Sequence, residues 1–109
     1  MKLVIAIVQD DDVSDLIDDL TESGYRITKL ATTGGFLKVG NTTLMIGVEE
    51  KEVDKVISKI EDICKTRKQV ISSASPMNSS TGMYIPYPME VNVGGATIFV
   101  VDVDKFVRV

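Results

Sequence analysis

The chain has 109 residues and a mass of 11.9 kDa, which fits one domain, residues 1–109, with a single core. Its 12 Lys and Arg residues against 16 Asp and Glu residues give a net charge of −4, which disfavours binding to a nucleic acid polymer. There is no His and one cysteine, Cys64, so the commonest general base, the commonest metal ligand and any internal disulfide are missing. Most catalytic chemistries therefore lack their usual groups, and we assign no metal site.

The first predicted element is a strand. Residues 3–8, LVIAIV, form an apolar run rich in β-branched side chains, which is typical of a buried strand. The run is the longest of its kind in the sequence and is too short to span a membrane, and no signal sequence opens the chain. We therefore expect a cytoplasmic protein without membrane insertion.

Two segments have the spacing of a helix with one apolar face. The first is residues 11–23, with Gly24 at the position of a C-terminal cap. Aspartates at residues 10–12 suit a helix N-terminus with a solvated face, which explains them more simply than a metal site. The second segment is residues 50–66, with acids first and basic residues last. Cys64 lies on its apolar face, so we interpret Cys64 as a buried small hydrophobe and not a nucleophile.

Further β-rich segments follow the first helix and the second. They are residues 25–32, 42–48, 89–93 and 96–101. The Gly94-Gly95 pair between the last two has the pattern of a two-residue hairpin turn. Residues 72–87 are rich in Ser, Pro and Met, have no clear period and predict a long loop after the second helix.

The predicted order is β-α-β-β-α-β with an extra β-ribbon. This order is typical of an α+β, ferredoxin-like fold, in which an antiparallel sheet carries both helices on one face. The strands at residues 3–8 and 97–103 are apolar on both faces, whereas two helices cover one face. We therefore predict self-association through the uncovered face.

Positive charge is concentrated in residues 25–48. This segment contains Arg26, Lys29 and Lys38 and no acid, so it carries +3 while the rest of the chain carries −7. Its Thr, Gly and Asn residues supply the donors that hold phosphates and nucleobase edges, which favours a small anionic ligand. The TTGGF string at residues 32–36 also fits a plain turn, and Phe36 fits either a core position or a stacking surface for a purine.

Residues 69–89 contain no charged side chain. A loop that binds a triphosphate is expected to carry Lys or Arg, so this composition argues against ATP. Tyr84 and Tyr87 fit an anchor for the loop base, or alternatively a surface for a protein partner.

The string RITKLATTGGFL at residues 26–37, followed by GNTT at 40–43 and by Gly47, resembles the PII-like cyclic-di-AMP receptor family of Gram-positive bacteria. The resemblance extends over essentially the whole chain. It implies a PII-like homotrimer of ferredoxin-like subunits that holds cyclic-di-AMP in clefts between subunits. It also implies no catalytic activity, no cofactor, and signalling by loop reordering to a downstream protein that the sequence does not identify.

The resemblance implies eight ligand-binding positions in this chain. They are Arg26, Thr28, Gly35, Phe36, Leu37, Asn41, Gly47 and Phe99. Thr28, Asn41 and the backbone around Gly47 correspond to groups that contact adenine and phosphate, and Arg26 lies at the cleft. Residues 35–37 correspond to a lid, and Phe99 to an apolar wall against a base. Residues 107–109 lack the amide of the family's tail, so the resemblance assigns no role to Arg108.

Two other functions fit parts of the sequence. A PII-type ATP or ADP sensor would use the same fold, although the uncharged loop disfavours it. A small acylphosphatase-like hydrolase would need an arginine and an asparagine poised on one water, and Arg26 and Asn41 are the candidates.

Overall fold

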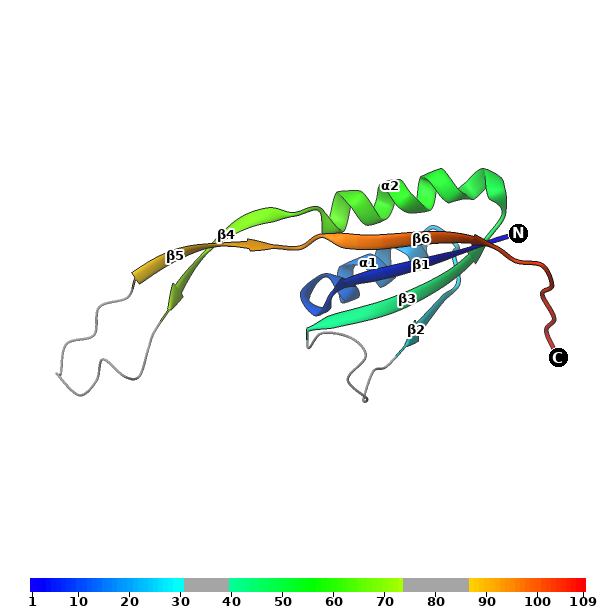
Figure 1. Ribbon diagram of the computed structural model, residues 1–109, viewed down its shortest axis with the longest axis horizontal. Coiled ribbons are helices and arrows are strands. Elements are labelled where there is room, and N and C mark those ends of the chain that lie inside the picture. Colours follow the sequence, from blue (N-terminus) through cyan, green and yellow to red (C-terminus); the bar gives the residue numbers. More distant parts are fainter. Residues whose placement is uncertain (31–39, 74–86) are drawn as a thin grey trace.

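The computed structural model describes residues 1–30, 40–73 and 87–109. The elements in chain order are β1 (Lys2–Gln9), α1 (Asp10–Glu22), β2 (Ile27–Leu30), β3 (Asn41–Val48), a 3-10 turn η1 (Glu50–Glu52), α2 (Val53–Cys64), β4 (Arg67–Ser73), β5 (Tyr87–Val93) and β6 (Ala96–Asp102). The main sheet is antiparallel, with the strand order β2-β3-β1-β6 (Figure 1). This is the ferredoxin-like arrangement, and the predicted fold class is confirmed.

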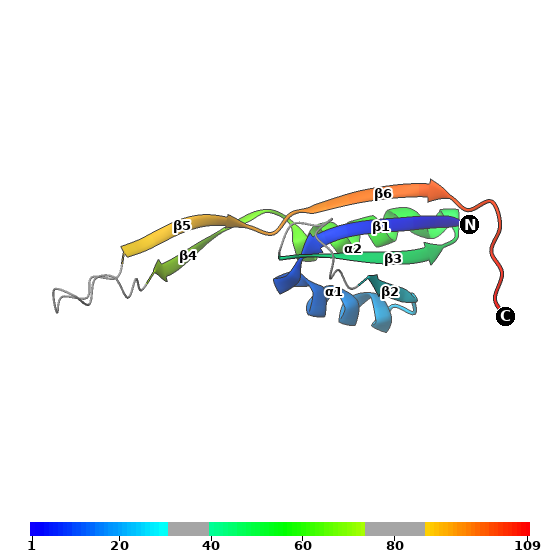
Figure 2. The ribbon, with the colours of Figure 1, turned by 60° about the horizontal axis from the view of Figure 1, so that its bottom comes forward.

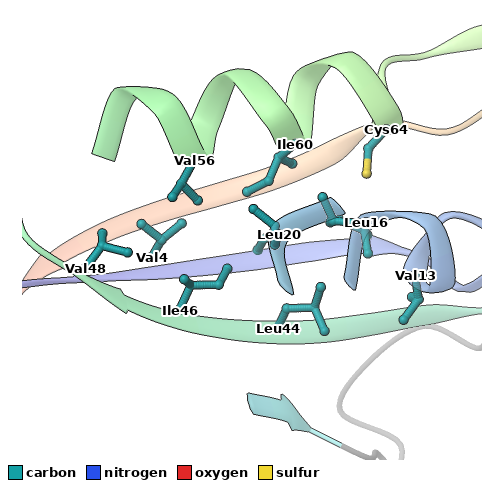
Figure 3. Close-up of a cluster of buried hydrophobic side chains, with 12 residues drawn as sticks. Val4, Val13, Leu16, Leu20, Leu44, Ile46, Val48, Val56, Ile60 and Cys64 are labelled. Carbon is teal, nitrogen blue, oxygen red and sulfur yellow. The ribbon is translucent and has the colours of Figure 1, made fainter. Parts of the chain in front are cut away.

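The core lies between the main sheet and the two helices, as Figure 3 shows. Alternate residues of β1, namely Val4, Ala6 and Val8, point to the helices and are buried. Leu44 and Ile46 of the neighbouring β3 face the same way, because they pair with Ala6 and Val4. One side of the sheet is therefore closed by apolar packing.

The opposite side of the sheet carries apolar residues that neither α1 nor α2 covers. Leu3, Ile5 and Ile7 of β1 are half-buried there, and Phe99 and Val101 of β6 are 53% and 42% exposed. We call this surface the open face. The prediction that these strands are apolar on both faces is confirmed.

α1 ends at a glycine cap, as predicted. Gly24 has a φ of +91°, and its N–H and that of Tyr25 donate to the carbonyls of Thr21 and Leu20. This pair of hydrogen bonds satisfies the last turn of the helix. α1 begins and ends one residue earlier than the predicted 11–23.

α2 is shorter than the predicted 50–66. Residues Glu50–Glu52 form the 3-10 turn, and the backbone becomes extended at Lys65. Among the described residues, no helix is long and apolar enough to cross a membrane.

The predicted hairpin at the Gly94-Gly95 pair is wrong. β5 pairs with β4, and β6 pairs with β1, so the two glycines carry the chain from a separate ribbon into the main sheet. Their φ angles are +85° and +93°, which L side chains rarely adopt. β4 was not predicted. Of the predicted loop at residues 72–87, Ser72, Ser73 and Tyr87 lie in strands, and residues 74–86 lie outside the described residues.

The β4–β5 ribbon projects from the body, as Figures 1 and 2 show. The radius of gyration is 18.4 Å, whereas a compact domain of this length has about 13 Å. The ribbon and the chain termini lie at opposite ends of the body (Figure 1).

Candidate functional site

A groove of about 680 Å³ is lined by residues from both ends of the chain, among them Met1 and Phe106. It therefore lies at the end of the sheet where Figure 1 shows the two termini. It brings together three of the predicted positions, Arg26, Thr28 and Gly47. The reason is the strand register: Ile27 of β2 pairs with Ile46 of β3, so the residues that flank this pair are neighbours. Two segments of the positive region thus meet in one groove.

Gly47 leaves the groove floor open. A Cβ atom on Gly47 would meet no atom of the described residues within 4 Å, and the backbone there does not need a glycine conformation. A glycine inside a strand often marks a place where a ligand approaches the backbone closely. The geometry therefore suits a backbone contact at this position.

The groove carries two guanidinium groups, from Arg26 and from Arg108 of the tail. Within the described part of the chain, neither of them lies within ion-pair distance of a carboxylate. Planar guanidinium groups suit phosphate oxygens, because they can donate two parallel hydrogen bonds. The two arginines can therefore hold an anion.

The acids of the groove are held by other groups. The Tyr25 hydroxyl donates to Glu52 Oε2 at 2.8 Å, which lowers the pKa of Glu52 and raises the pKa of Tyr25. Lys55 also lies 3.7 Å from Glu52 and lowers its pKa further. The amino group of Met1 lies 4.0 Å from Glu49. Lys55 and the Met1 amino group offset the negative charge of these two carboxylates, whereas the Tyr25 hydroxyl favours the ionised form of Glu52.

Apolar side chains form other parts of the groove wall. Leu3 and Met45 come from the sheet, and Phe106 comes from the tail. Phe106 is exposed, so its ring is accessible to a stacking partner. Sequence reasoning missed Tyr25, Glu52 and Phe106 as groove residues. No local pattern indicates that the residues before β2, the η1 turn and the tail share a groove.

Asn41 lies in a second cavity, of about 340 Å³, at the ribbon end of the body. It starts β3, whereas Gly47 is close to the end of the same strand. Six residues of strand span about 20 Å. The structure therefore does not bring Asn41 together with Arg26, Thr28 and Gly47 within one chain.

Phe99 lies on the open face. Thr28, Met45, Ile5 and Phe99 form one row across the four strands, since each pairs with the next. Three strand spacings separate Thr28 from Phe99, or about 14 Å. The three remaining predicted positions, Gly35, Phe36 and Leu37, lie outside the described residues, as do Lys38 and Tyr84.

The aspartates at residues 10–12 differ in part from the prediction. They lie in the first turn of α1, where acids suit the helix dipole, but the N-cap residue is Gln9, which makes no capping hydrogen bond through its side chain. Asp12 is not solvated: it is 4% exposed and pairs with Arg67, with Oδ1 at 2.7 Å from Nη2. Within residues 1–30, 40–73 and 87–109, no group of three or more Cys, Asp or Glu residues is placed to hold a metal ion.

Cys64 is fully buried at the end of α2, as predicted. Burial, with a smaller contribution from the nearby Asp12 carboxylate, raises the pKa of its thiol to about 11. A buried thiol with this pKa stays protonated at neutral pH, so it is not a nucleophile.

Three comparisons with known proteins bear on this chain. A family model described as "Cyclic-di-AMP receptor" matches residues 1–109. A protein of Methanothermococcus thermolithotrophicus, "Nitrogen fixation nifHD region GlnB-like protein 1", is 38% identical over 79 residues, which cover 61% of this chain and 75% of that protein. The crystal structure of a functionally unknown protein from Pediococcus pentosaceus ATCC 25745 is similar with a TM-score of 0.77 and 45% identity, over 99% of this chain and 96% of that one.

Proposed function

The chain belongs to the cyclic-di-AMP receptor family, and we propose that it binds cyclic-di-AMP in clefts between the subunits of a homotrimer. Occupancy of the clefts rearranges loops and so signals to a downstream protein partner. The protein acts by binding and not by catalysis.

The groove has the chemistry that this ligand requires. Cyclic-di-AMP carries two phosphates and two purines, so its site needs cations, hydrogen-bond donors and stacking surfaces together. Arg26 and Arg108 supply the cations, Thr28 supplies a hydroxyl, and Phe106 supplies a ring. The open floor at Gly47 gives a base edge access to the backbone.

The main support for a site between subunits is the distance between the predicted ligand-binding positions within one chain. The groove residues, Asn41 and Phe99 lie in three places that are about 14–20 Å apart by strand geometry. If two subunits pack together, ligand-binding positions of one subunit can lie beside those of the other. Assembly would then complete a site that is divided within a single chain. The proposed ligand contacts thus require assembly.

The open face supports the same assembly. Its row of Ile5, Met45 and Phe99 is apolar and lacks a helix over it. Exposed contiguous apolar surface of this kind is typical of a protein interface. Three copies in a closed ring would cover these faces without leaving an open end.

The separation also argues against the acylphosphatase-like alternative. That activity would need Arg26 and Asn41 on the same water molecule. The two residues line different cavities at opposite ends of β3. The GlnB-like relative keeps a PII-type ATP or ADP sensor as the second candidate.

Calorimetric titration with cyclic-di-AMP, cyclic-di-GMP, ATP, ADP and AMP tests the proposal, together with the mass from light scattering. We expect cyclic-di-AMP to bind tightest, with one molecule per subunit, to a particle of about three times the 11.9 kDa chain mass. Tighter binding of ATP or ADP would favour the PII-type sensor. A monomer throughout would overturn the intersubunit site.

Thr28→Ala and Asn41→Ala locate the site. Each removes a proposed hydrogen-bond partner of the ligand, so each is expected to weaken cyclic-di-AMP binding by about 1–3 kcal/mol with the fold intact. Ser58→Ala is the control, because it removes an exposed hydroxyl from α2 and Ser58 lines neither cavity. Equal affinities for all three variants would place the site elsewhere.

A further inference from the structure

The connection from β1 to α1, residues 9–12, contacts several distant parts of the chain, and we call it the junction. The Gln9 side-chain carbonyl accepts a hydrogen bond from the Gly94 N–H at 2.7 Å. The Asp10 N–H donates to the Gly40 carbonyl at 2.8 Å, and the Asp10 carboxylate accepts from the Thr42 hydroxyl at 2.5 Å. The junction therefore ties the start of β3 to the point where β5 leads into β6.

The junction also holds the start of β4. The buried Asp12 carboxylate accepts hydrogen bonds from both terminal nitrogens of Arg67, at 2.7 and 3.4 Å. A buried carboxylate is costly without its partner, so this pair holds Arg67 against the first turn of α1. The packing is close: a Cβ atom on Gly94 would lie 2.6 Å from the Lys65 carbonyl oxygen and 2.7 Å from Arg67 Nη1.

The ribbon depends on these contacts for its direction. It projects from the body (Figure 1), with β4 beginning at Arg67 and β5 ending next to Gly94. A two-stranded ribbon is marginally stable by itself, so its orientation is set where it joins the body. The Arg67 and Gly94 contacts lie at this base.

The same junction lies beside a proposed ligand position. Gln9 pairs with Asn41 in the register of β1 and β3, and both line the 340 Å³ cavity together with Gly94. A ligand group that bonds to Asn41 therefore lies next to the side chain that holds the ribbon base.

We infer that Gln9 is a positioning residue that couples ligand occupancy at Asn41 to the orientation of the β4–β5 ribbon. This inference rests on the proposed function. A ligand that fixes the start of β3 strengthens the Gln9 and Asp10 contacts and so restrains the ribbon base. Since coupling between two equilibria is reciprocal, a ribbon base that is loosened at Gln9 weakens ligand binding by the same factor.

Hydrogen exchange of the full chain with and without cyclic-di-AMP tests the coupling. In the wild type we expect the ligand to slow exchange at residues 67–70 and 90–95 by about fivefold or more, the lower end of the usual coupling range. In Gln9→Ala we expect this slowing to fall below about twofold, and the Kd to rise by about fivefold, because the coupling is lost. Gln9→Met is the second variant, for the case in which the short alanine side chain disturbs the fold. Methionine keeps the length of the side chain without its carbonyl, so we expect the same result.

Asn92→Ala is the matched control, because it removes an amide from an exposed position of β5 rather than from the junction. It should keep the wild-type response. If the wild type binds the ligand while the ribbon base exchanges identically in both states, the inference is overturned and the proposed function stands. The same holds if Gln9→Ala and Gln9→Met respond like the wild type. No binding to the wild type would overturn the proposed function and this inference together.

Discussion

The two faces of the main sheet are both apolar, but they have different surroundings. On the helix face Val4, Leu44 and Ile46 are completely buried. On the open face Phe99 is half exposed and lies in the same row as Thr28. Because side chains alternate along a strand, residues of the fold and residues of the proposed function are immediate neighbours in the sequence. Adjacent substitutions can therefore separate folding from function.

The largest effect is expected on the helix face. Leu44→Ala removes a buried side chain from the core, which is expected to lower the free energy of unfolding by about 2–5 kcal/mol. Met45→Ala, at the next residue, changes a half-buried side chain on the open face, so we expect less than half that loss. Urea denaturation measures both, and equal losses would contradict the distinction between the two faces.

Assembly should fail when the open face is made polar. Phe99→Ser is expected to reduce the particle from about three chains to a single chain of 11.9 kDa, with unchanged circular dichroism. Val70→Ser is the matched control, because Val70 is an exposed apolar residue of the ribbon and not of the sheet. Light scattering with chromatography distinguishes the variants. A trimer with serine at position 99 would mean that another surface holds the subunits together.

Much of the fold could be predicted because it depends on local patterns. The apolar run of β1 and the helical periodicity around Leu16 and Ile60 indicate their elements without reference to the rest of the chain. The sequence predicts an extra ribbon, but it does not indicate which strands form it. The Gly94-Gly95 pair has a local hairpin pattern, but β6 pairs with β1, some 90 residues earlier, and β4 has too many polar residues to show a buried face.

The composition of the candidate groove could be predicted in part. Arg26, Thr28 and Gly47 meet because two consecutive strands pair, and a charge count along the sequence already points to this region. The predicted strand at residues 42–48 already separates Asn41 from Gly47, but only the structure shows that the two residues line different cavities. Phe106 and Arg108 reach the groove through a tail that has no pattern of its own.

A substitution at Gly47 is expected to weaken ligand binding without unfolding the protein. The space beside this glycine is open and its backbone is that of an ordinary strand, so Gly47→Val should fold. The new side chain would occupy the groove floor and is expected to weaken cyclic-di-AMP binding at least tenfold, or about 1.4 kcal/mol. Calorimetry gives the affinity and a thermal melt gives the stability. A variant that melts like the wild type and binds equally well would remove the groove floor from the site.

The smallest effect concerns the groove wall and depends on pH. The hydrogen bond from the Tyr25 hydroxyl holds the pKa of Glu52 below its ordinary value. A carboxyl whose pKa is lowered by folding stabilises the folded state above its unfolded pKa, and this contribution is lost as the pH falls through the folded pKa. Tyr25→Phe should therefore melt at a slightly lower temperature than the wild type at pH 7, and the difference should shrink in strong acid.

The contribution of Tyr25 itself has the opposite dependence. Its pKa is raised, so its contribution is present at neutral pH and is lost only as the pH rises through the folded pKa. Lys55 remains beside Glu52 in the Tyr25→Phe variant, so the variant keeps part of the acid dependence. Thermal melts of both proteins between pH 3 and pH 7 measure the difference. A difference that is constant over this range would mean that the Tyr25 ring acts through packing in the groove wall, and that its hydroxyl does not hold Glu52 in the charged state.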